Sequence, residues 1–349
     1  MTMTPGSPLA YTLFILVCLI IITLPFIPAF MEWLRPTDIA ALPVLANYTS
    51  DIDHFARRLH SDVMARLGDS MPTGHEDFEV LPRQAAGQTD WSAARRRMIS
   101  HEIDTDAAIN TSQQLYVRGN IRAGANSAFP SLYATGDIDL GPNSSIQDWA
   151  HADGELRMRA NGQALRRVSA DKAIELGTDT WFERMNAPAI YFGGRRQPGV
   201  PAAKLAQTPG SYADLPDAVE QTPLLFLVRG NCVLAAGKLY TGSLVVTGFL
   251  VIGAGTTVAG DVKAREGVSM DHSARIEGAI TCEKRVYVFN DSQVFGPVIA
   301  EGDLLIGAGA VVGLPDSPTT VSAANIIVED GVVVHGTIWA HEIGMVKPV

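Results

Sequence analysis

Apolar positions in the last third of the chain repeat with a fixed period. Four of them lie 18 residues apart, namely Leu250, Val268, Val286 and Leu304. Glycines keep the same spacing at Gly242, Gly260, Gly278 and Gly296, and Gly336 holds the matching place in its own coil. A fixed period of this kind is typical of stacked repeat structures, and the glycines are expected where the chain turns a tight corner.

Each 18-residue coil contains a shorter period of six. The apolar triplets are Ile252, Val258 and Ala264, then Met270, Ile276 and Cys282, then Val288, Val294 and Ala300. Because alternate side chains of a strand point to opposite faces, three short strands per coil would turn these residues towards one axis. The pattern predicts an all-β fold, a single-stranded β-helix (solenoid) of ~18 residues per coil. Cys282 shares its column with alanines and is predicted to be a small core residue.

The repeat continues upstream with less regularity. A further coil begins at Cys232, and the coil from Leu304 has 22 residues, with four extra residues expected in a loop at 315–318. Leu156, Ile174 and Phe192 are again 18 apart, and Leu115 precedes Leu132 by 17. The predicted organisation is degenerate β-helical repeats at 111–192, a Pro-rich loop or linker at 193–222 and a β-helix at 223–349. For the Pro-rich segment we favour a long excursion from one continuous solenoid over a linker between domains.

The N-terminal segment is predicted to be a membrane anchor, residues 1–35. Residues 1–31 carry no charged side chain, and Leu9 to Met31 form a run of 23 mostly apolar residues. At about 1.5 Å per residue, one transmembrane helix of this length crosses the ~30 Å hydrocarbon core. The predicted span includes Leu9, Phe14, Leu19, Ile22 and Met31. A cleaved signal peptide is less favoured, because no Lys or Arg precedes the apolar run.

The next segment, residues 36–110, is predicted to be a juxtamembrane amphipathic helix and a linker. Ile52, Phe55, Leu59 and Val63 have helical spacing, and Gly68 ends the pattern. Such a helix lies on a membrane surface, pairs with another copy or packs on its own domain, and the pattern leaves these alternatives open. One more short helix is expected around Trp91–His101.

Net charge, cysteine spacing and the motifs of the sequence argue against several classes of function. The net charge of −10 argues against nucleic acid as a partner. Cys18, Cys232 and Cys282 form no CxxC pair, so neither a disulfide framework nor a zinc site is predicted. The sequence has no P-loop, Rossmann fingerprint or nucleophile elbow. We therefore predict no catalytic residue, no metal and no cofactor.

Hexapeptide-repeat acyltransferases, with a left-handed β-helix and a catalytic histidine between subunits, are the alternative function. The strings at 252–255 and 306–309 are similar to their repeats, and the candidate bases are His272, His335 and His341. In a strand, the adjacent acids Asp271 and Glu342 would point to the opposite face, so exposed histidines without a catalytic role are favoured.

A carbohydrate-active β-helix would need carboxylates that repeat one coil apart. Asp261 is matched by Ala279 one coil later, and Glu266 is matched by Lys284. No acidic ladder persists in these coils, which disfavours this class.

The coil sequences GTTVAGDVKAREG, SARIEGAITCEKR and GVVVHGTIWAHE resemble the bactofilins, polymer-forming proteins of the bacterial cytoskeleton. The resemblance covers roughly Leu224 to Ile343. It implies a β-helical core that assembles end to end without nucleotide, often at a membrane, and it brings no catalytic residues. Bactofilins have a short solenoid with disordered tails, whereas this chain has an apolar N-terminal run and a second repeat region that would cap one end.

The last coil is predicted to carry self-association, because a terminal coil exposes unpaired backbone groups unless a cap covers it. The candidate residues are Val332, Val334, Ile338 and Trp339. The predicted function is a membrane-anchored, bactofilin-like, non-catalytic scaffold that self-assembles or recruits partners. Its expected partners are a lipid bilayer, other copies of the chain and envelope-associated proteins. The expected location is the bacterial inner membrane, as a single-pass protein whose solenoid is cytoplasmic because Arg35 follows the span.

Overall fold

The structure is a computed structural model that describes residues 8–27, 30–31, 52–68, 76–81, 90–195 and 207–348. The chain forms two compact units, Met1–Ser50 and Asp51–Val349. In the first unit, helix α1 (Pro8–Thr23) is followed by the 3-10 helix η1 (Leu24–Phe26). Across the described ranges, no helix combines the length and the hydropathy that crossing a bilayer requires. The predicted transmembrane helix over Leu9–Met31 is thus not supported, since α1 has 16 residues.

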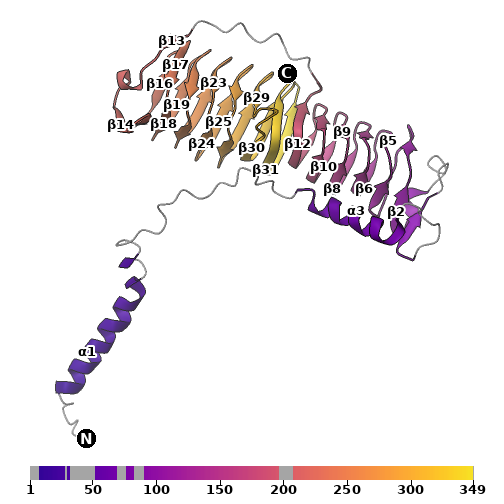
Figure 1. Cartoon of the computed structure of the whole chain (residues 1–349), viewed down its shortest axis with the longest axis horizontal. Coiled ribbons are helices and arrows are strands. Elements are labelled where there is room, and N and C mark those ends of the chain that lie inside the picture. The colour runs from indigo at the N-terminus through magenta and orange to yellow at the C-terminus, as the bar shows by residue number, and fades with distance from the viewer. Residues whose placement is uncertain are drawn as a thin grey trace. The chain divides into compact units, whose positions relative to one another are not determined.

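The second unit is a β-solenoid of about 14 turns with ~18 residues per coil, as predicted. Its N-terminal half stacks parallel strands coil upon coil (Figure 1). Here most coils contain a longer strand and a short one instead of the predicted three. The strands are β1 (Phe78–Val80), β2 (Arg97–Ser100), β3 (Ile103–Asp104), β4 (Leu115–Val117), β5 (Ile121–Ala123), β6 (Ala128–Ala134), β7 (Ile138–Leu140), β8 (Ser145–Ala152), β9 (Glu155–Met158), β10 (Gln163–Ala170), β11 (Ala173–Leu176) and β12 (Trp181–Phe192).

The C-terminal half has three short strands in each regular coil, as the six-residue period predicts. These strands are β13 (Thr208–Pro209), β14 (Ala218–Thr222), β15 (Leu225–Val228), β16 (Cys232–Leu234), β17 (Lys238–Thr241), β18 (Ser243–Val246), β19 (Phe249–Ile252), β20 (Thr257–Ala259), β21 (Val262–Ala264), β22 (Gly267–Met270), β23 (Arg275–Ile276), β24 (Ile280–Cys282), β25 (Arg285–Val288), β26 (Gln293–Val294), β27 (Val298–Ala300), β28 (Asp303–Ile306), β29 (Val311–Val312), β30 (Thr319–Glu329) and β31 (Val333–Lys347).

The predicted register of the C-terminal half is confirmed. Leu250 pairs with Val268, and the same column continues through Val286 and Leu304. Leu304 then pairs with Ile326, 22 residues later, because residues 315–318 form an exposed loop. Upstream, the expected partner of Ile174 is wrong: Ile174 pairs with Ile190, and Phe192 pairs with Leu176.

The six-residue triplets form three columns of the core. Ile252, Val258 and Ala264 are fully buried and pair with their equivalents in the next coil. Each fully buried Val or Ile contributes ~1.5–3 kcal/mol, so the stacked columns stabilise the coils together. Cys282 lies between Ala264 and Ala300 and is 2% exposed, which confirms it as a small core residue.

Corners of the N-terminal half are formed by Asn and Asp. Asn126, Asn143, Asn161 and Asp179 have φ values between 57° and 61°. These side chains tolerate the left-handed region better than most non-glycine residues do. The degenerate half therefore has a regular corner that a search for repeated glycines misses.

The glycine column of the C-terminal half is explained by close approach of successive coils. A Cβ added to Gly260 would lie 2.3 Å from the carbonyl oxygen of Gly242. Gly242 itself has a φ of 104°, whereas no left-handed φ is recorded at Gly260. Tight corners thus account for part of the column, and contact between coils accounts for the rest.

Replacing Gly260 by Ala is expected to destabilise the solenoid by about 1–3 kcal/mol, because the added methyl group forces two coils apart. Urea unfolding followed by circular dichroism measures this loss. Lys263→Ala, at an exposed position of the neighbouring strand β21, serves as the control and should change stability by less than about 0.5 kcal/mol. Equal stability of the two variants would contradict the close-approach explanation.

The two halves join through their last coils, and their strands run in opposite directions. β12 pairs antiparallel with β31, with Met185 opposite Ile338 and Ile190 opposite Val334. All four side chains are fully buried, and one hydrophobic core runs through both halves. Figure 1 shows β12 beside β31 at the middle of this unit. Two opposed solenoids in one sheet replace the single continuous solenoid favoured from the sequence.

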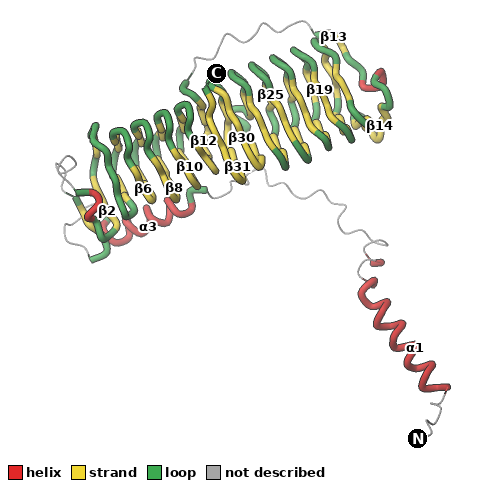
Figure 2. Tube along the Cα trace, turned by 180° about the vertical axis from the view of Figure 1, so that it is seen from behind, coloured by secondary structure: helices red, strands yellow, loops and turns green. Residues whose placement is uncertain are grey.

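The predicted loop at 193–222 connects the junction with the far end of the C-terminal half. Its residues 196–206 lie outside the described ranges. The remainder contains β13, the 3-10 helix η3 (Tyr212–Asp214) and β14. β13 pairs with β17 and β14 with β15, at the end remote from β31 (Figure 2). The second half is therefore built from its remote end back towards the junction.

Most of the predicted linker before residue 111 belongs to the solenoid where it is described. β1, β2 and β3 form its first coils, and Met98 and Ile99 are fully buried. The helix expected around Trp91–His101 is wrong in extent, since the 3-10 helix η2 covers Trp91–Ala93 and β2 follows. The solenoid thus begins before the predicted boundary at residue 111, because its first coils carry few repeated glycines by which they could be recognised.

Helix α3 (His54–Leu67) packs along the N-terminal half (Figure 2). Its buried residues are Ala56, Leu59, Val63 and Leu67, and they contact Ile99, Tyr116, Tyr133 and Trp149 of the sheet. Phe55, expected on the apolar face, is 46% exposed, and the guanidinium of Arg167 lies 5.0 Å from its ring centre. Of the alternatives left open by the sequence, packing on its own domain is the one observed.

Candidate functional site

The residues predicted to carry self-association lie inside the junction. Val332, Val334 and Ile338 are fully buried in the core. Trp339 is partly exposed and lies opposite Arg184 of β12, whose guanidinium is 4.5 Å from the centre of the indole. The edge that was expected to be open is paired within the chain. The premise that the last coil is an open edge is therefore wrong.

The candidate catalytic histidines are dispersed over the surface. His272 Nδ1 lies 3.0 Å from Asp271 Oδ1, and both side chains are more than half exposed. The two residues meet because they occupy a corner, so the expectation that Asp271 faces away is wrong. His335 Nδ1 lies 2.9 Å from the Pro188 carbonyl, and His341 Nε2 lies 2.9 Å from Ser322 Oγ. The structure brings no two of these three histidines together.

The residues predicted to span a membrane lie in α1 and just after it. Leu9, Phe14, Leu19, Ile22 and Met31 all have more than half of their surface exposed. Apolar side chains exposed along a helix are typical of a lipid-binding or protein-binding segment.

A continuous outward-facing column of residues crosses the N-terminal half beneath α3. It consists of Ile99, Tyr116, Tyr133, His151, Ser169 and Asn186, each paired with the next. The rings of Tyr116 and Tyr133 stack at 5.0 Å, and His60 of α3 stacks on Tyr133 at 5.3 Å. His60 Nδ1 also lies 3.1 Å from the Tyr116 hydroxyl. The column thus holds α3 through aromatic and polar contacts, and it contains a buried histidine.

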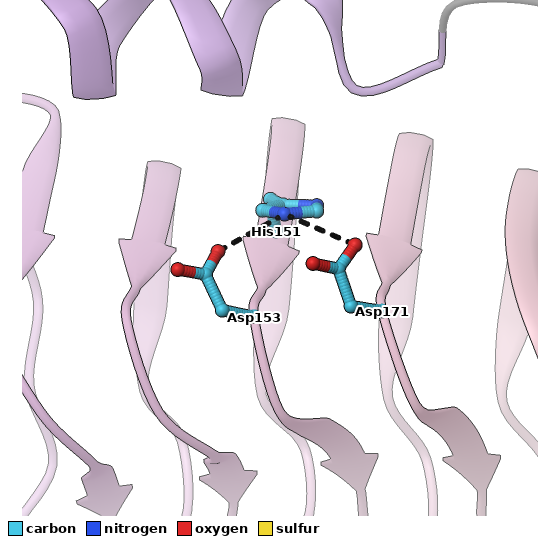
Figure 3. Close-up of side chains that lie close together, drawn as sticks. All are labelled: His151, Asp153 and Asp171. Atoms are coloured by element: carbon cyan, nitrogen blue, oxygen red, sulfur yellow. Dashed lines mark ion pairs between the residues drawn. The ribbon is translucent and has the colours of Figure 1, made fainter.

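His151 lies between two carboxylates at the end of the part covered by α3. Figure 3 shows Asp153 and Asp171 on either side of the His151 ring. His151 Nε2 is 3.3 Å from Asp153 Oδ1 and 3.8 Å from Asp171 Oδ1. One donor atom from each of the three residues lies within 4.8 Å of the others. Among the described residues, this is the one group of three or more such side chains arranged closely enough to hold a metal ion.

The surroundings of His151 favour a neutral imidazole. Its side chain is nearly completely buried, and burial lowers the pKa of His151, while the charges of Asp171 and Asp153 oppose that shift. On the other ring nitrogen, Nδ1 lies 2.8 Å from Ser169 Oγ. The Tyr133 hydroxyl donates to Asp153 Oδ1 at 2.7 Å. The histidine and one of its carboxylates are therefore both held in place by further polar contacts.

A groove of about 590 Å³ runs beside α3. Its lining is Phe55, Arg58, Leu59, Ser61, Asp62, Arg66, Arg97, Gln114 and Trp149. Asp62 accepts hydrogen bonds from Arg66 at 2.7 Å and from Arg97 at 2.9 Å. Since an internal carboxylate engages these two arginines, the groove is a weak candidate for an anion site.

The remote end of the C-terminal half is capped over its core by Tyr212. This ring is 2% exposed; it stacks on Tyr240 with the ring centres 5.1 Å apart and packs at a tilt against Phe226 at 5.0 Å. Its hydroxyl donates to the carbonyl of Gly242 at 3.2 Å, and burial raises the pKa of Tyr212. The aromatic cap keeps the apolar columns of the first coil away from water.

At the same end, two strands each have one edge that no other described strand pairs. Among the strands the structure describes, β14 pairs only with β15, and β16 pairs only with β19. Four apolar residues are exposed there, namely Val219 at 53%, Leu224 at 57%, Val233 at 64% and Leu239 at 37%. This end offers both unpaired backbone groups and apolar side chains to a partner.

A signal for the His151 cluster was present in the sequence. Asp153 and Asp171 are 18 residues apart, which is one coil, and His151 precedes Asp153 by two. The 18-residue period thus holds in the degenerate half as well, and it places both carboxylates beside the histidine.

The protein was compared with family models, curated proteins and solved structures. None of these three searches found a match. The resemblance to bactofilins is therefore carried by the coil sequences themselves, and no family is assigned to the chain.

Proposed function

We propose that this protein is a non-catalytic scaffold that binds a lipid bilayer through its N-terminal apolar helix and self-associates through the remote end of its C-terminal half. The observation that carries the proposal is the pair of strand edges at β14 and β16 that no other described strand covers, with exposed Val219 and Val233 beside them. This function is the bactofilin-like one expected from the coil sequences, with the interface at the remote end of the C-terminal half instead of at the last coil.

Open strand edges favour pairing with another chain. Each edge displays backbone N–H and C=O groups that a second strand satisfies, and apolar side chains beside the edge add burial. The chain itself joins two solenoid ends in this way, through β12 and β31. Two copies related by a twofold axis would pair the edges of their first coils in the same antiparallel manner.

A lateral face of the solenoid supports partner recruitment. The outward residues of successive coils on this face are Val233, Val251, Ser269, Tyr287, Leu305 and Ile327. An outward column with this many apolar members is unusual for a surface that faces only water. We expect envelope-associated proteins to bind along it.

Membrane attachment is the third part of the proposal. The exposed apolar side chains of α1 support binding to a bilayer. We place the protein at the inner membrane of a bacterium with its solenoid in the cytoplasm. Flotation of the full chain with lipid vesicles, compared with a variant carrying Leu16→Lys and Ile20→Lys, measures this attachment.

Self-association is tested with the full chain in detergent, by light scattering and electron microscopy. Pairing of one open end gives a dimer, and filaments require the end at β1 and β3 to pair as well. Val233→Arg is expected to abolish the dimer, because it places like charges opposite each other across the twofold axis. Val251→Arg, which carries the same change one coil further in, is the matched control.

The two variants separate the outcomes. Loss of the dimer in Val233→Arg alone supports pairing through the end. Loss of the dimer in both variants would show that the interface lies on the lateral face. A wild-type chain that stays monomeric at every concentration tested would refute self-association altogether.

A further inference from the structure

The cluster at His151 has the composition and spacing of a metal site, and the argument for it is independent of the proposed scaffold function. His151 belongs to β8, Asp153 directly follows that strand, and Asp171 directly follows β10. Ala152 pairs with Ala170, so the two aspartates occupy equivalent positions in successive coils. The fold thereby brings one imidazole and two carboxylates from adjacent coils to one place.

The orientation of the imidazole directs one nitrogen at the two carboxylates. Nδ1 lies 2.8 Å from Ser169 Oγ, and an Nδ1–H that donates to this oxygen leaves the lone pair on Nε2. The distances from Nε2 to the carboxylate oxygens, 3.3 and 3.8 Å, exceed the usual hydrogen-bond range of about 2.7–3.2 Å. The Nε2 lone pair and the two carboxylates thus face one another, an arrangement that a bound cation would stabilise.

The imidazole is 3% exposed, so the surrounding protein fixes the position of Nε2 and little of the ring is accessible to water.

We propose that His151 Nε2 and the carboxylates of Asp153 and Asp171 bind one divalent ion of the zinc class. Ligands about 2.1 Å from Zn²⁺ at the tetrahedral angle are separated by roughly 3.4 Å, close to the distances observed here. A mixed imidazole and carboxylate set suits Zn²⁺ better than Mg²⁺ or Ca²⁺, which prefer oxygen ligands alone.

Two of the three proposed ligands are held by further hydrogen bonds, as the ligands of metal sites commonly are. Ser169 Oγ fixes the imidazole from behind, and the Tyr133 hydroxyl holds Asp153 by a 2.7 Å hydrogen bond. The side chains of Asp153 and Asp171 are 35% and 55% exposed, so water has access to complete the coordination. Because the carboxylates come from adjacent coils, the ion would cross-link these coils.

The test measures Zn²⁺ binding to the full chain, purified in detergent without a polyhistidine tag. After chelator treatment, titration calorimetry should find one saturable equivalent of Zn²⁺, and Co²⁺ should give the visible absorption of a four-coordinate site. The melting temperature should rise on addition of Zn²⁺, since the ion binds the folded state.

Asp171→Asn removes one charged ligand from an exposed side chain and is expected to weaken Zn²⁺ binding roughly tenfold or more. Asp148→Asn, at an exposed position of the same half, is the matched control and should bind as the wild type does. Melting of both metal-free variants at the wild-type temperature shows that the fold is intact. Equal affinity in the two variants, or no saturable binding by the wild type, would show that the cluster is a structural His–Asp pair.

Discussion

Replacing Ile338 by Asp is expected to separate the two solenoid halves and to cost more than about 4 kcal/mol. Ile338 is fully buried between Met185 of β12 and Val321 of β30. The change removes ~1.5–3 kcal/mol of apolar burial and places a carboxyl group without a partner in the core. A solenoid is stabilised by contacts between neighbouring coils, so the loss falls on the junction first.

Urea unfolding and limited proteolysis of the Ile338→Asp variant detect this separation. We expect the single transition of the wild type to divide into two, with cleavage appearing between the halves. Thr320→Asp is the control, because Thr320 is exposed in the neighbouring strand, next to Thr337. If Ile338→Asp unfolds in one transition at the wild-type midpoint, the junction contributes little to stability.

Replacing Tyr212 by Ala is expected to destabilise the remote end by roughly 3–5 kcal/mol, as for other buried aromatic residues. The variant loses the ring contacts with Tyr240 and Phe226 and uncovers the first coil. Aggregation should increase together with the loss of stability, since exposed core columns associate without specificity. Thermal unfolding and turbidity measure the two effects.

Tyr212→Phe separates the ring from its hydroxyl. This variant keeps the stacking and loses the hydrogen bond to the Gly242 carbonyl, which contributes about 0.5–1.5 kcal/mol. A loss in Tyr212→Phe as large as that in Tyr212→Ala would assign the capping effect to the hydroxyl instead of the ring.

The regular half of the solenoid could be predicted closely from the sequence. The 18-residue period fixes the pairing of Leu250 with Val268, because parallel stacking puts equivalent residues of successive coils side by side. The six-residue period fixes the inward columns in the same way, and even the place of Cys282 follows from it. Local periodicity is sufficient wherever each coil contacts its neighbours in sequence.

The junction could not be predicted, because its contacts are not periodic. Met185 and Ile338 are paired across opposed strands, and no spacing in the sequence relates them. The last coil, predicted to be open, is consequently paired with β12. The 18-residue period also relates Asp153 to Asp171, but the degenerate coils are harder to recognise, since one of their corners uses Asn and Asp.

The reversal of strand direction at the junction has a consequence for biosynthesis. The edge of β12 receives its partner β31 about 140 residues later in the chain. At a translation rate of about 5–20 residues per second, the finished N-terminal half would wait roughly 7 to 28 seconds with an uncovered strand. The edge of its final coil therefore stays exposed until β31 has been made, and its closure is the step at which newly made chains most easily pair with each other instead of with themselves.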